Sequence, residues 1–564
     1  MSGNLIHFTP SAYHYPLLIK HLLHAPLARS PDQEIVYRDV RHTYRTFRER
    51  IGRLATGLTE IGVKPGDVVA VMDWDSNRYH ECYFAIPMMG AVLQTVNIAL
   101  SPEQLLYILN DTGASAILVN VDFLPLIEKL ADKLSAVRKY ILMSDRPELP
   151  ATTLPVAAEY EAMLETSSPF FRFPDFDENT RATTFHTTGT TGRPKGVYFS
   201  HRQIFLHTLA VQAEYGQTPV QGRSHRDDVY MPMTPLFHVH GWGSPYSMTA
   251  SGCKQVYPGR YSPETFLRLI KTEGVTFTHC VPTILQMLLT APGSADVDLS
   301  KLKMVVGGSA LPRALARAAM DRGIDIFAGY GLSESGPFLT TAHVETRHLT
   351  DDIEEQITYR TKCGYPGPMV DLRIVDNEGQ DVPRDGKATG EIVARAPWLT
   401  MGYLNNPEAS EQLWAGGYMH TGDVASIDPE GNLHVTDRLK DIIKSGGEWI
   451  SSIELEDIVL MMKGISKAAV IAVKDEKWGE RPLVLVTVLP EYAGKIDRED
   501  IRAHVAAYAS KGLISRFAVP ERILFVEKLP LTSVGKIDKK VLRDTMHDDL
   551  VKSGSELAFG AAAR

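Results

Sequence analysis

The 564-residue sequence has few cysteines, no long apolar run and no excess of positive charge. Its four cysteines are far apart and match no zinc-binding spacing, which argues against a scaffold built on metal or disulfides. No apolar run reaches bilayer length, and the N-terminal residues lack the pattern of a signal peptide. The net charge of −9 argues against a nucleic-acid-binding protein, because a phosphate backbone requires a basic surface. These absences predict a soluble, cytoplasmic protein.

The chain is long enough for more than one hydrophobic core, so at least two domains are expected. Through its first two-thirds, strand-like apolar stretches such as VVAVM at 68–72 alternate with helical stripes such as the one from Phe47 to Ile61. Ser101-Pro102-Glu103-Gln104 is typical of a helix start, with a capping box. This alternation predicts an α/β fold with mostly parallel, helix-covered sheets.

The pattern changes near residue 437. A turn-rich stretch at 363–436 is expected to form a β region, a distorted β-barrel, that closes the larger domain. Beyond it, the order of helix and strand signals predicts a small α+β domain. We therefore expect an N-terminal ATP- and acyl-binding domain at 1–437 and a C-terminal lid domain at 438–564.

The most informative stretch is the glycine- and threonine-rich segment from Thr187 to Gly196. Glycines let the backbone approach a ligand closely, and hydroxyl groups and a lysine add donors for anionic oxygens. The spacing is not that of a Walker loop, and strand-like residues flank the segment on both sides, so it is expected to join two strands. The candidate phosphate-binding residues are Thr187, Thr188, Gly189, Thr190, Thr191, Gly192 and Lys195.

A second glycine-containing motif, GYGLSE, occupies residues 329–334. A tyrosine face can stack on adenine, a serine hydroxyl can reach a phosphate, and a carboxylate is a hard ligand for Mg²⁺. The turn that begins at Gly307 follows an apolar strand, and its small residues would let a substrate lie against the backbone. Alone, the GYGLSE motif is more often a turn at the end of a strand, and the Gly307 turn is compatible with a tight strand-to-helix turn.

Together these segments resemble the adenylate-forming superfamily, which contains acyl- and aryl-CoA ligases, peptide-synthetase adenylation domains and beetle luciferases. TTGTTGRPKGV is similar to its phosphate-loop signature, and the resemblance extends from Thr43 to Leu542. Two positions depart from the common pattern: Ser333 stands where threonine is commoner, and His186 replaces an aromatic residue before the loop. The chain is most similar to medium-chain fatty-acid–CoA ligases.

The resemblance implies roles for individual residues. Thr187 and Glu334 would hold Mg²⁺, Asp423 would bind both ribose hydroxyls, and Lys536, in PLTSVGKID, would be the catalytic lysine. Arg438 would also contact the ribose, and Lys440 would be the hinge about which a mobile C-terminal domain swings. Further nucleotide- or CoA-site candidates are Gly308, Gly329, Tyr330, Gly331, Ser333, Lys444 and Trp449.

The segment Thr234–Trp242 is similar to the family segment that lines the acyl tunnel. His238 stands where amino-acid-activating relatives have an aspartate, so an α-amino acid substrate is not expected. With Lys536, His238 is a candidate catalytic residue. The acyl-site candidates are His238, Val239, Trp242, Gly307 and Gly308.

The resemblance implies an ATP-, Mg²⁺- and coenzyme A-dependent acyl-CoA ligase that acts through an acyl-adenylate on a medium-chain or short fatty acid. Alternatives are an aryl or methylthio acid as substrate, and a carrier-protein thiol as acceptor in place of CoA. A luciferase-type oxygenation and a non-enzymatic nucleotide-binding protein fit less well, the latter because Lys195, Glu334, Asp423 and Lys536 are all present. Fatty-acyl relatives suggest a homodimer.

Overall fold

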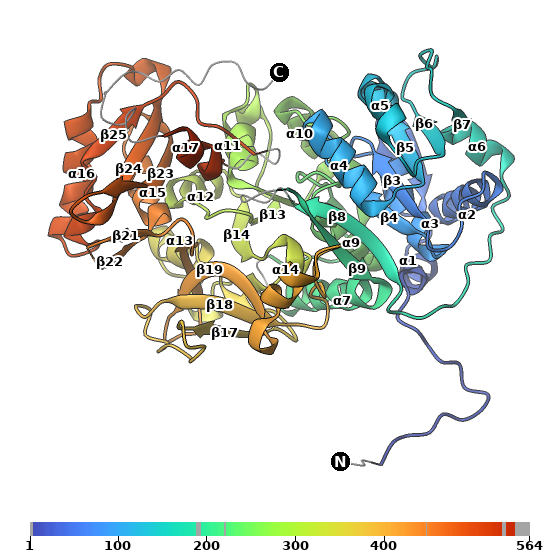
Figure 1. Ribbon diagram of the computed structural model, residues 1–564, viewed down its shortest axis with the longest axis horizontal. Coiled ribbons are helices and arrows are strands. Elements are labelled where there is room, and N and C mark those ends of the chain that lie inside the picture. The colour runs from blue at the N-terminus through green and yellow to red at the C-terminus, as the bar shows by residue number, and fades with distance from the viewer. Residues whose placement is uncertain (1–3, 188–192, 219–221, 447, 533–536, 547–564) are drawn as a thin grey trace.

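The computed structural model describes residues 4–187, 193–218, 222–446, 448–532 and 537–546. It contains four β-sheets, of which three belong to a large N-terminal domain and one to a smaller C-terminal domain. Figure 1 shows the C-terminal elements gathered in a lobe of their own, beside the sheets of the N-terminal residues. The mixed α/β fold expected from the sequence is confirmed.

The seven-stranded sheet has the order β7-β6-β5-β3-β4-β8-β9 and is parallel except for the last pair. Its central strands β3 and β5 are buried throughout, as expected for parallel strands with helices on both faces. The strands are β3 (Val68–Met72), β4 (Val92–Thr95), β5 (Ala116–Asn120), β6 (Lys139–Met143), β7 (Val156–Glu159), β8 (Arg181–Thr187) and β9 (Lys195–Ser200). The helices from α1 to α6 are α1 (His24–Arg29), α2 (Tyr44–Glu60), α3 (Asn77–Met88), α4 (Pro102–Thr112), α5 (Leu124–Leu130) and α6 (Tyr160–Thr166).

The nine-stranded sheet has the order β16-β15-β14-β13-β12-β10-β11-β1-β2 and is parallel from β14 to β1. Its strands are β1 (Glu34–Tyr37), β2 (Val40–Thr43), β10 (Val229–Tyr230), β11 (Lys254–Tyr257), β12 (Phe277–Cys280), β13 (Lys303–Val306), β14 (Asp325–Tyr330), β15 (Thr340–Thr341) and β16 (Tyr365–Pro366). The helices from α7 to α13 are α7 (His201–Gln217), α8 (Val239–Trp242), α9 (Ser244–Ser251), α10 (Pro263–Leu269), α11 (Pro282–Thr290), α12 (Arg313–Asp321) and α13 (Ile353–Arg360).

The turn-rich stretch forms an antiparallel four-stranded sheet in the order β17-β18-β19-β20. Where the sequence suggested a distorted barrel, the described strands form this sheet. Its elements are β17 (Asp371–Val375), β18 (Gly390–Arg395), α14 (Pro407–Leu413), β19 (Met419–Ile427) and β20 (Leu433–Arg438). The predicted domain boundary after residue 437 falls at the end of β20.

The C-terminal domain has a sheet in the order β22-β21-β24-β23, and β25 also pairs with β24. Its core is formed mainly by aliphatic side chains from α15, α16 and the two long strands β23 and β24. Its elements are β21 (Ile443–Ser445), β22 (Glu448–Ile450), α15 (Ser452–Leu460), β23 (Ile465–Asp475), β24 (Gly479–Val488), α16 (Arg498–Ser510), β25 (Arg522–Phe525) and α17 (Lys539–Thr545).

Local sequence signals explain several element boundaries. The capping box predicted at Ser101 is present, and a second one begins α7 at Ser200, each with a reciprocal glutamine three residues later. The predicted apolar stripe is the buried face of α2. None of the described helices is long and apolar enough to cross a membrane.

Candidate active site

The predicted phosphate loop joins two antiparallel strands, as the flanking residues suggested. Thr187 ends β8 and Lys195 begins β9, and these two residues are paired across the hairpin. Thr188, Gly189, Thr190, Thr191 and Gly192 lie outside the described residues. Two side chains of α4 contact the two ends of the loop: Asp111 lies 2.9 Å from His186 Nε2, and the Tyr107 ring lies 5.3 Å from the Arg193 guanidinium.

Glu334 and Lys195 both contact one tyrosine that the sequence did not single out. The Tyr403 hydroxyl donates a 2.8 Å hydrogen bond to Glu334 Oε1, and Lys195 Nζ lies 4.4 Å from the centre of the Tyr403 ring. Burial raises the pKa of the Glu334 carboxyl group, whereas the Tyr403 hydrogen bond and the charges of Arg438 and Lys195 act to lower it. The carboxylate is thus surrounded by positive charge and by a hydrogen-bond donor.

A second polar cluster surrounds Asp423 in β19. The Tyr330 hydroxyl donates a 2.8 Å hydrogen bond to Asp423 Oδ2, and Arg438 Nε lies 3.4 Å from Asp423 Oδ1. Asp423 and Arg438 are also cross-strand partners in β19 and β20. Tyr330 and Glu334 belong to the same motif at the end of β14, with Gly331 and Ser333 between them, so the two clusters are continuous.

The predicted acyl segment has an unusual backbone. Val239, His240, Gly241, Trp242 and Gly243 all have positive φ, between 48° and 70°. A left-handed conformation costs about 1–2 kcal/mol per non-glycine residue, and a β-branched valine is especially unfavourable there. Such strain persists only where the surrounding structure enforces it, and it concentrates at functional sites.

The residues just before the strained segment are held by side chains from β4, α3 and the connection between β3 and α3. The buried Asp75 carboxylate accepts a 2.9 Å hydrogen bond from the Leu236 backbone N–H. The Tyr83 hydroxyl donates to the Leu236 carbonyl, and the Thr95 hydroxyl donates to the Phe237 carbonyl at 3.1 Å. Sequence analysis missed these three residues, because nothing local to them indicates a partner over 140 positions away.

Trp242 packs between two other parts of the predicted acyl site. Its indole stacks on His279, with ring centres 5.0 Å apart, and a Cβ added to Gly307 would lie 3.1 Å from it. His279 is fixed by the Tyr230 hydroxyl at 2.8 Å and by Thr234 at 3.1 Å, and burial lowers its pKa to about 3. Glycine at 307 therefore leaves room for the indole.

The predicted hinge follows β20 directly. Burial lowers the pKa of Lys440 to about 8, and the positive charges of Arg438 and Arg543 contribute, while Asp441 and Asp423 oppose the shift. Lys444 and Trp449 are paired across β21 and β22. Lys536 lies outside the described residues; the neighbouring Ile537 forms an isolated bridge with Leu531.

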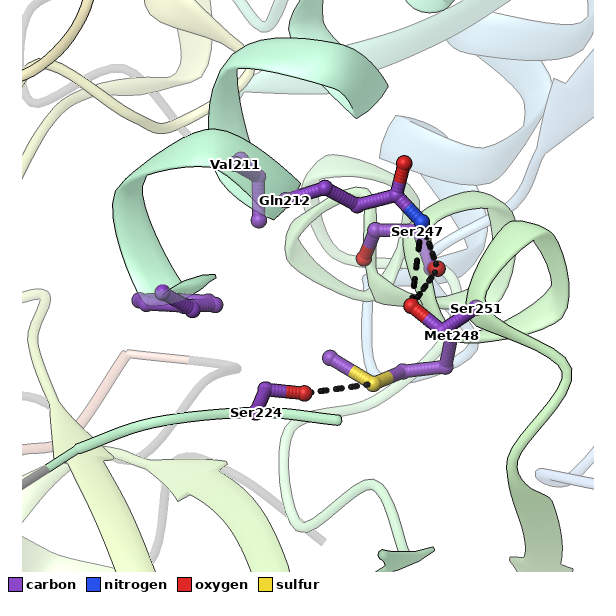
Figure 2. A pocket seen from close by; sticks show the side chains of 7 residues that line it. Val211, Gln212, Ser224, Ser247, Met248 and Ser251 are labelled. Atoms are coloured by element: carbon purple, nitrogen blue, oxygen red, sulfur yellow. Dashed lines mark hydrogen bonds between the residues drawn. The ribbon is translucent and has the colours of Figure 1, made fainter. Parts of the chain in front are cut away.

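A small cavity lies away from these polar clusters. Its volume is about 60 Å³, and most of its lining residues belong to α7 and α9 (Figure 2). Gln212, which lines it, already donates hydrogen bonds to the Ser247 carbonyl and the Ser251 hydroxyl. This volume is enough for about two water molecules. None of its lining residues is a predicted site residue.

Within the described ranges, no three His, Cys, Asp or Glu residues form a group that could hold a metal ion by themselves. Mg²⁺ is usually held by one or two protein ligands together with substrate phosphates. Glu334, with one oxygen bound by Tyr403, and the Thr187 hydroxyl group fit such a site.

The described residues form a large and a smaller domain, and the predicted phosphate loop joins the hairpin strands β8 and β9 of the large one. Residues 23–404 match the family model described as AMP-binding enzyme, and residues 454–536 match the AMP-binding enzyme C-terminal domain. The chain therefore belongs to the AMP-binding enzyme family, which is the adenylate-forming superfamily that its motifs resemble.

Curated relatives are similar along most of the chain. A long-chain-fatty-acid–CoA ligase of Thermus thermophilus is 40% identical over 89% of this chain and 90% of its own length. A 3-methylmercaptopropionyl-CoA ligase of Ruegeria lacuscaerulensis is 38% identical over 88% of this chain and 90% of its own length. A medium-chain-fatty-acid–CoA ligase of Ectopseudomonas oleovorans is 35% identical over 92% and 93%, respectively.

Solved structures share the fold. The anthranilate CoA ligase AuaEII in complex with anthranoyl-AMP matches 94% of this chain and 98% of its own, with a TM-score of 0.82 and 24% identity. ATP-bound MatB from Rhodopseudomonas palustris matches 95% of this chain and 100% of its own, with a TM-score of 0.80 and 23% identity. At these identities the likeness supports the fold alone.

Proposed function

We propose that this protein is an ATP- and Mg²⁺-dependent acid–CoA ligase. It converts a carboxylic acid, ATP and CoA into acyl-CoA, AMP and diphosphate through an acyl-adenylate. The observation that carries the proposal is the convergence of Lys195, Glu334, Asp423 and Arg438 from three sheet regions, because this set supplies both cationic and anionic groups for a nucleotide.

The proposed role of each residue follows from its charge. Lys195 and the glycine-rich loop offer donors to the phosphates, and the Asp423 carboxylate accepts hydrogen bonds from the ribose hydroxyls, with Arg438 beside it. Mg²⁺, when bound by Glu334 and Thr187, neutralises the charge of the leaving diphosphate. Lys536 places a positive charge between the substrate carboxylate and the α-phosphate, two anions that otherwise repel each other.

The second half-reaction needs a different set of residues at the site. We propose that residues 438–564 swing about Lys440, which removes Lys536 and brings the segment that contains Lys444 and Trp449 to the nucleotide. The CoA thiolate then attacks the acyl carbonyl and AMP leaves. The position of Lys440 directly after β20, where the four-stranded sheet ends, supports this hinge.

The proposed substrate is a medium-chain or short fatty acid. Trp242 fills the space between His279 and Gly307, which favours a slender acyl chain over a bulky one. Relatives named for fatty acids and for 3-methylmercaptopropionate are similarly close to this chain, so a methylthio or aryl acid is the alternative. A homodimer is proposed from the fatty-acyl relatives, and sedimentation equilibrium tests it.

The test of function is ATP–diphosphate exchange with a panel of acids from acetate to palmitate, with aromatic and methylthio acids included. Exchange with at least one fatty acid, followed by AMP release that requires CoA, is expected. Absence of exchange with every acid would refute adenylation. Exchange followed by transfer to a carrier-protein thiol but not to CoA would refute CoA as the acyl acceptor.

A further inference from the structure

Three consecutive residues, Tyr403, Leu404 and Asn405, contact residues within or next to the proposed ATP site. The Tyr403 hydroxyl donates to Glu334 Oε1, and the Leu404 N–H donates a 2.8 Å hydrogen bond to the Gly196 carbonyl. The Asn405 side-chain amide donates to Asp111, the residue that contacts His186 at the start of the phosphate loop. None of the three has a role in the function proposed above.

Tyr403 is the member of this segment that contacts both charged groups. Its ring faces the Lys195 ammonium group at 4.4 Å, while its hydroxyl group binds Glu334 at 2.8 Å. Among the described residues, no ion pair within 4.0 Å joins Lys195 to Glu334, although the two charges are close enough to interact. The phenol therefore contacts both an ammonium group and a carboxylate, two charges that attract each other.

The backbone of Tyr403 is itself fixed. Its N–H donates a 2.8 Å hydrogen bond to the Ser410 hydroxyl in α14, and it forms a bridge with Val197 in β9. Asn405 has a φ of 53°, a conformation that few non-glycine residues adopt and that the contacts on both sides maintain. A ring held in this way can define the positions of the groups that pack against it.

We propose that Tyr403 is a positioning residue that keeps Lys195 and Glu334 apart and orients the Glu334 carboxylate, so that one oxygen stays free for the divalent cation. The inference rests on the proposed function, because it assigns Lys195 to the phosphates and Glu334 to Mg²⁺. The ring acts on nucleotide binding through Lys195, and the hydroxyl group acts on cation binding through Glu334. These two contributions are separable by mutation.

The experiment measures binding to the full-length protein rather than turnover. Isothermal titration gives the dissociation constant of ATP in EDTA, and electron paramagnetic resonance of free Mn²⁺ gives the cation's dissociation constant in saturating ATP. Tyr403→Phe keeps the ring and removes the hydroxyl group. It should leave metal-free ATP binding within about twofold of wild type and weaken Mn²⁺ binding by about tenfold or more, as is typical when the partner of a metal ligand is lost.

Two further variants complete the test. Tyr403→Leu also removes the ring and should weaken metal-free ATP binding, because Lys195 is then free to pair with Glu334. In a Glu334→Gln background, Tyr403→Phe should have no further effect on Mn²⁺ binding, since the two residues act as one unit. Tyr160→Phe is the matched control, because it removes a 2.6 Å tyrosine–glutamate hydrogen bond, to Glu81, away from the site.

The inference is overturned if Tyr403→Phe binds Mn²⁺ as wild type does, or if its effect persists unchanged in the Glu334→Gln background. If Tyr160→Phe weakened Mn²⁺ binding as much as Tyr403→Phe does, the effect would reflect a general loss of stability and not positioning by Tyr403. If the wild-type protein binds neither ATP nor Mn²⁺–ATP, the proposed function fails first. Wild-type binding with an unaffected Tyr403→Phe variant refutes the positioning role alone.

Discussion

Asp75 is a buried carboxyl group whose environment changes its acid–base behaviour. It accepts hydrogen bonds from the Leu236 N–H at 2.9 Å and the Tyr261 hydroxyl at 2.6 Å. Burial raises its pKa to about 7, and the negative charge of Asp73 adds to this, while the two hydrogen bonds oppose it. The group that holds the acyl segment is thus protonated over part of the neutral pH range.

A pH-dependent stability follows from this shift. Between about pH 4 and pH 7, the folded state keeps a proton on Asp75 that the unfolded state has lost, so the contribution of this group to stability falls as pH rises through that window. Asp75→Asn keeps an acceptor oxygen for Leu236 and removes the titration. Thermal unfolding is measured from about pH 4.5 to 8, and the stability of the variant should decline less steeply with pH than that of the wild type. An identical slope would contradict the assignment.

Trp242 is expected to limit the bulk of the acyl group. Because its indole fills the space between His279 and Gly307, Trp242→Ala should open that space to branched or aromatic acids. We expect kcat/KM for a bulky acid, relative to that for butyrate, to rise by about tenfold, a typical value for pocket contacts of this size. The ratio is measured by AMP release, and butyrate is the internal control. An unchanged ratio would place the acyl chain elsewhere.

At the scale of elements, α17 is attached to α15 and to the hinge region by two cationic side chains one turn apart. Lys539 Nζ lies 2.8 Å from Glu456 and 2.6 Å from the Ser452 hydroxyl in α15, and Arg543 pairs with Asp441 beside Lys440. Lys539 is enclosed, and the charges of Glu456 and Asp437 raise its pKa despite the opposing effect of burial. The helix that follows Lys536 is thereby connected to the predicted hinge.

Removing the lysine should leave buried negative charge without a partner. Lys539→Met is expected to destabilise the protein by about 3 kcal/mol, because breaking a buried ion pair costs more than the pair contributes. The double variant Lys539→Met, Glu456→Gln should recover most of the loss. Urea unfolding followed by circular dichroism measures both. Equal destabilisation of the single and double variants would show that Glu456 is not the relevant partner.

At the scale of the whole molecule, the two half-reactions should depend on different residues. Lys536→Ala is expected to abolish ATP–diphosphate exchange and to spare much of the thioester formation from supplied acyl-AMP. Lys440→Pro is expected to impair thioester formation and to spare ATP–diphosphate exchange, because proline fixes φ at the residue about which the domain turns. Rapid-quench assays of each half-reaction measure both. Equal loss of the two half-reactions in either variant would contradict its assigned role.

Much of the fold could be predicted from the sequence because its signals are local. The capping boxes at Ser101 and Ser200, the stripe on α2 and the strand pair around the phosphate loop depend on residues within a few positions of one another. The form of the 363–436 region was harder to predict, because the pairing of β17 to β20 depends on non-local hydrogen bonds.

Contiguous motifs were sufficient to indicate the family, the alternating α/β order and the chemical identity of the proposed nucleotide-binding groups. The contacts of Tyr403 with Lys195 and Glu334, and of Asp75 with Leu236, are visible only in the folded structure. The partners in these contacts are 69 or more positions apart. Their residue types carry no local signal, because a tyrosine or an aspartate acquires such a role only when packing brings distant backbone segments within hydrogen-bonding distance.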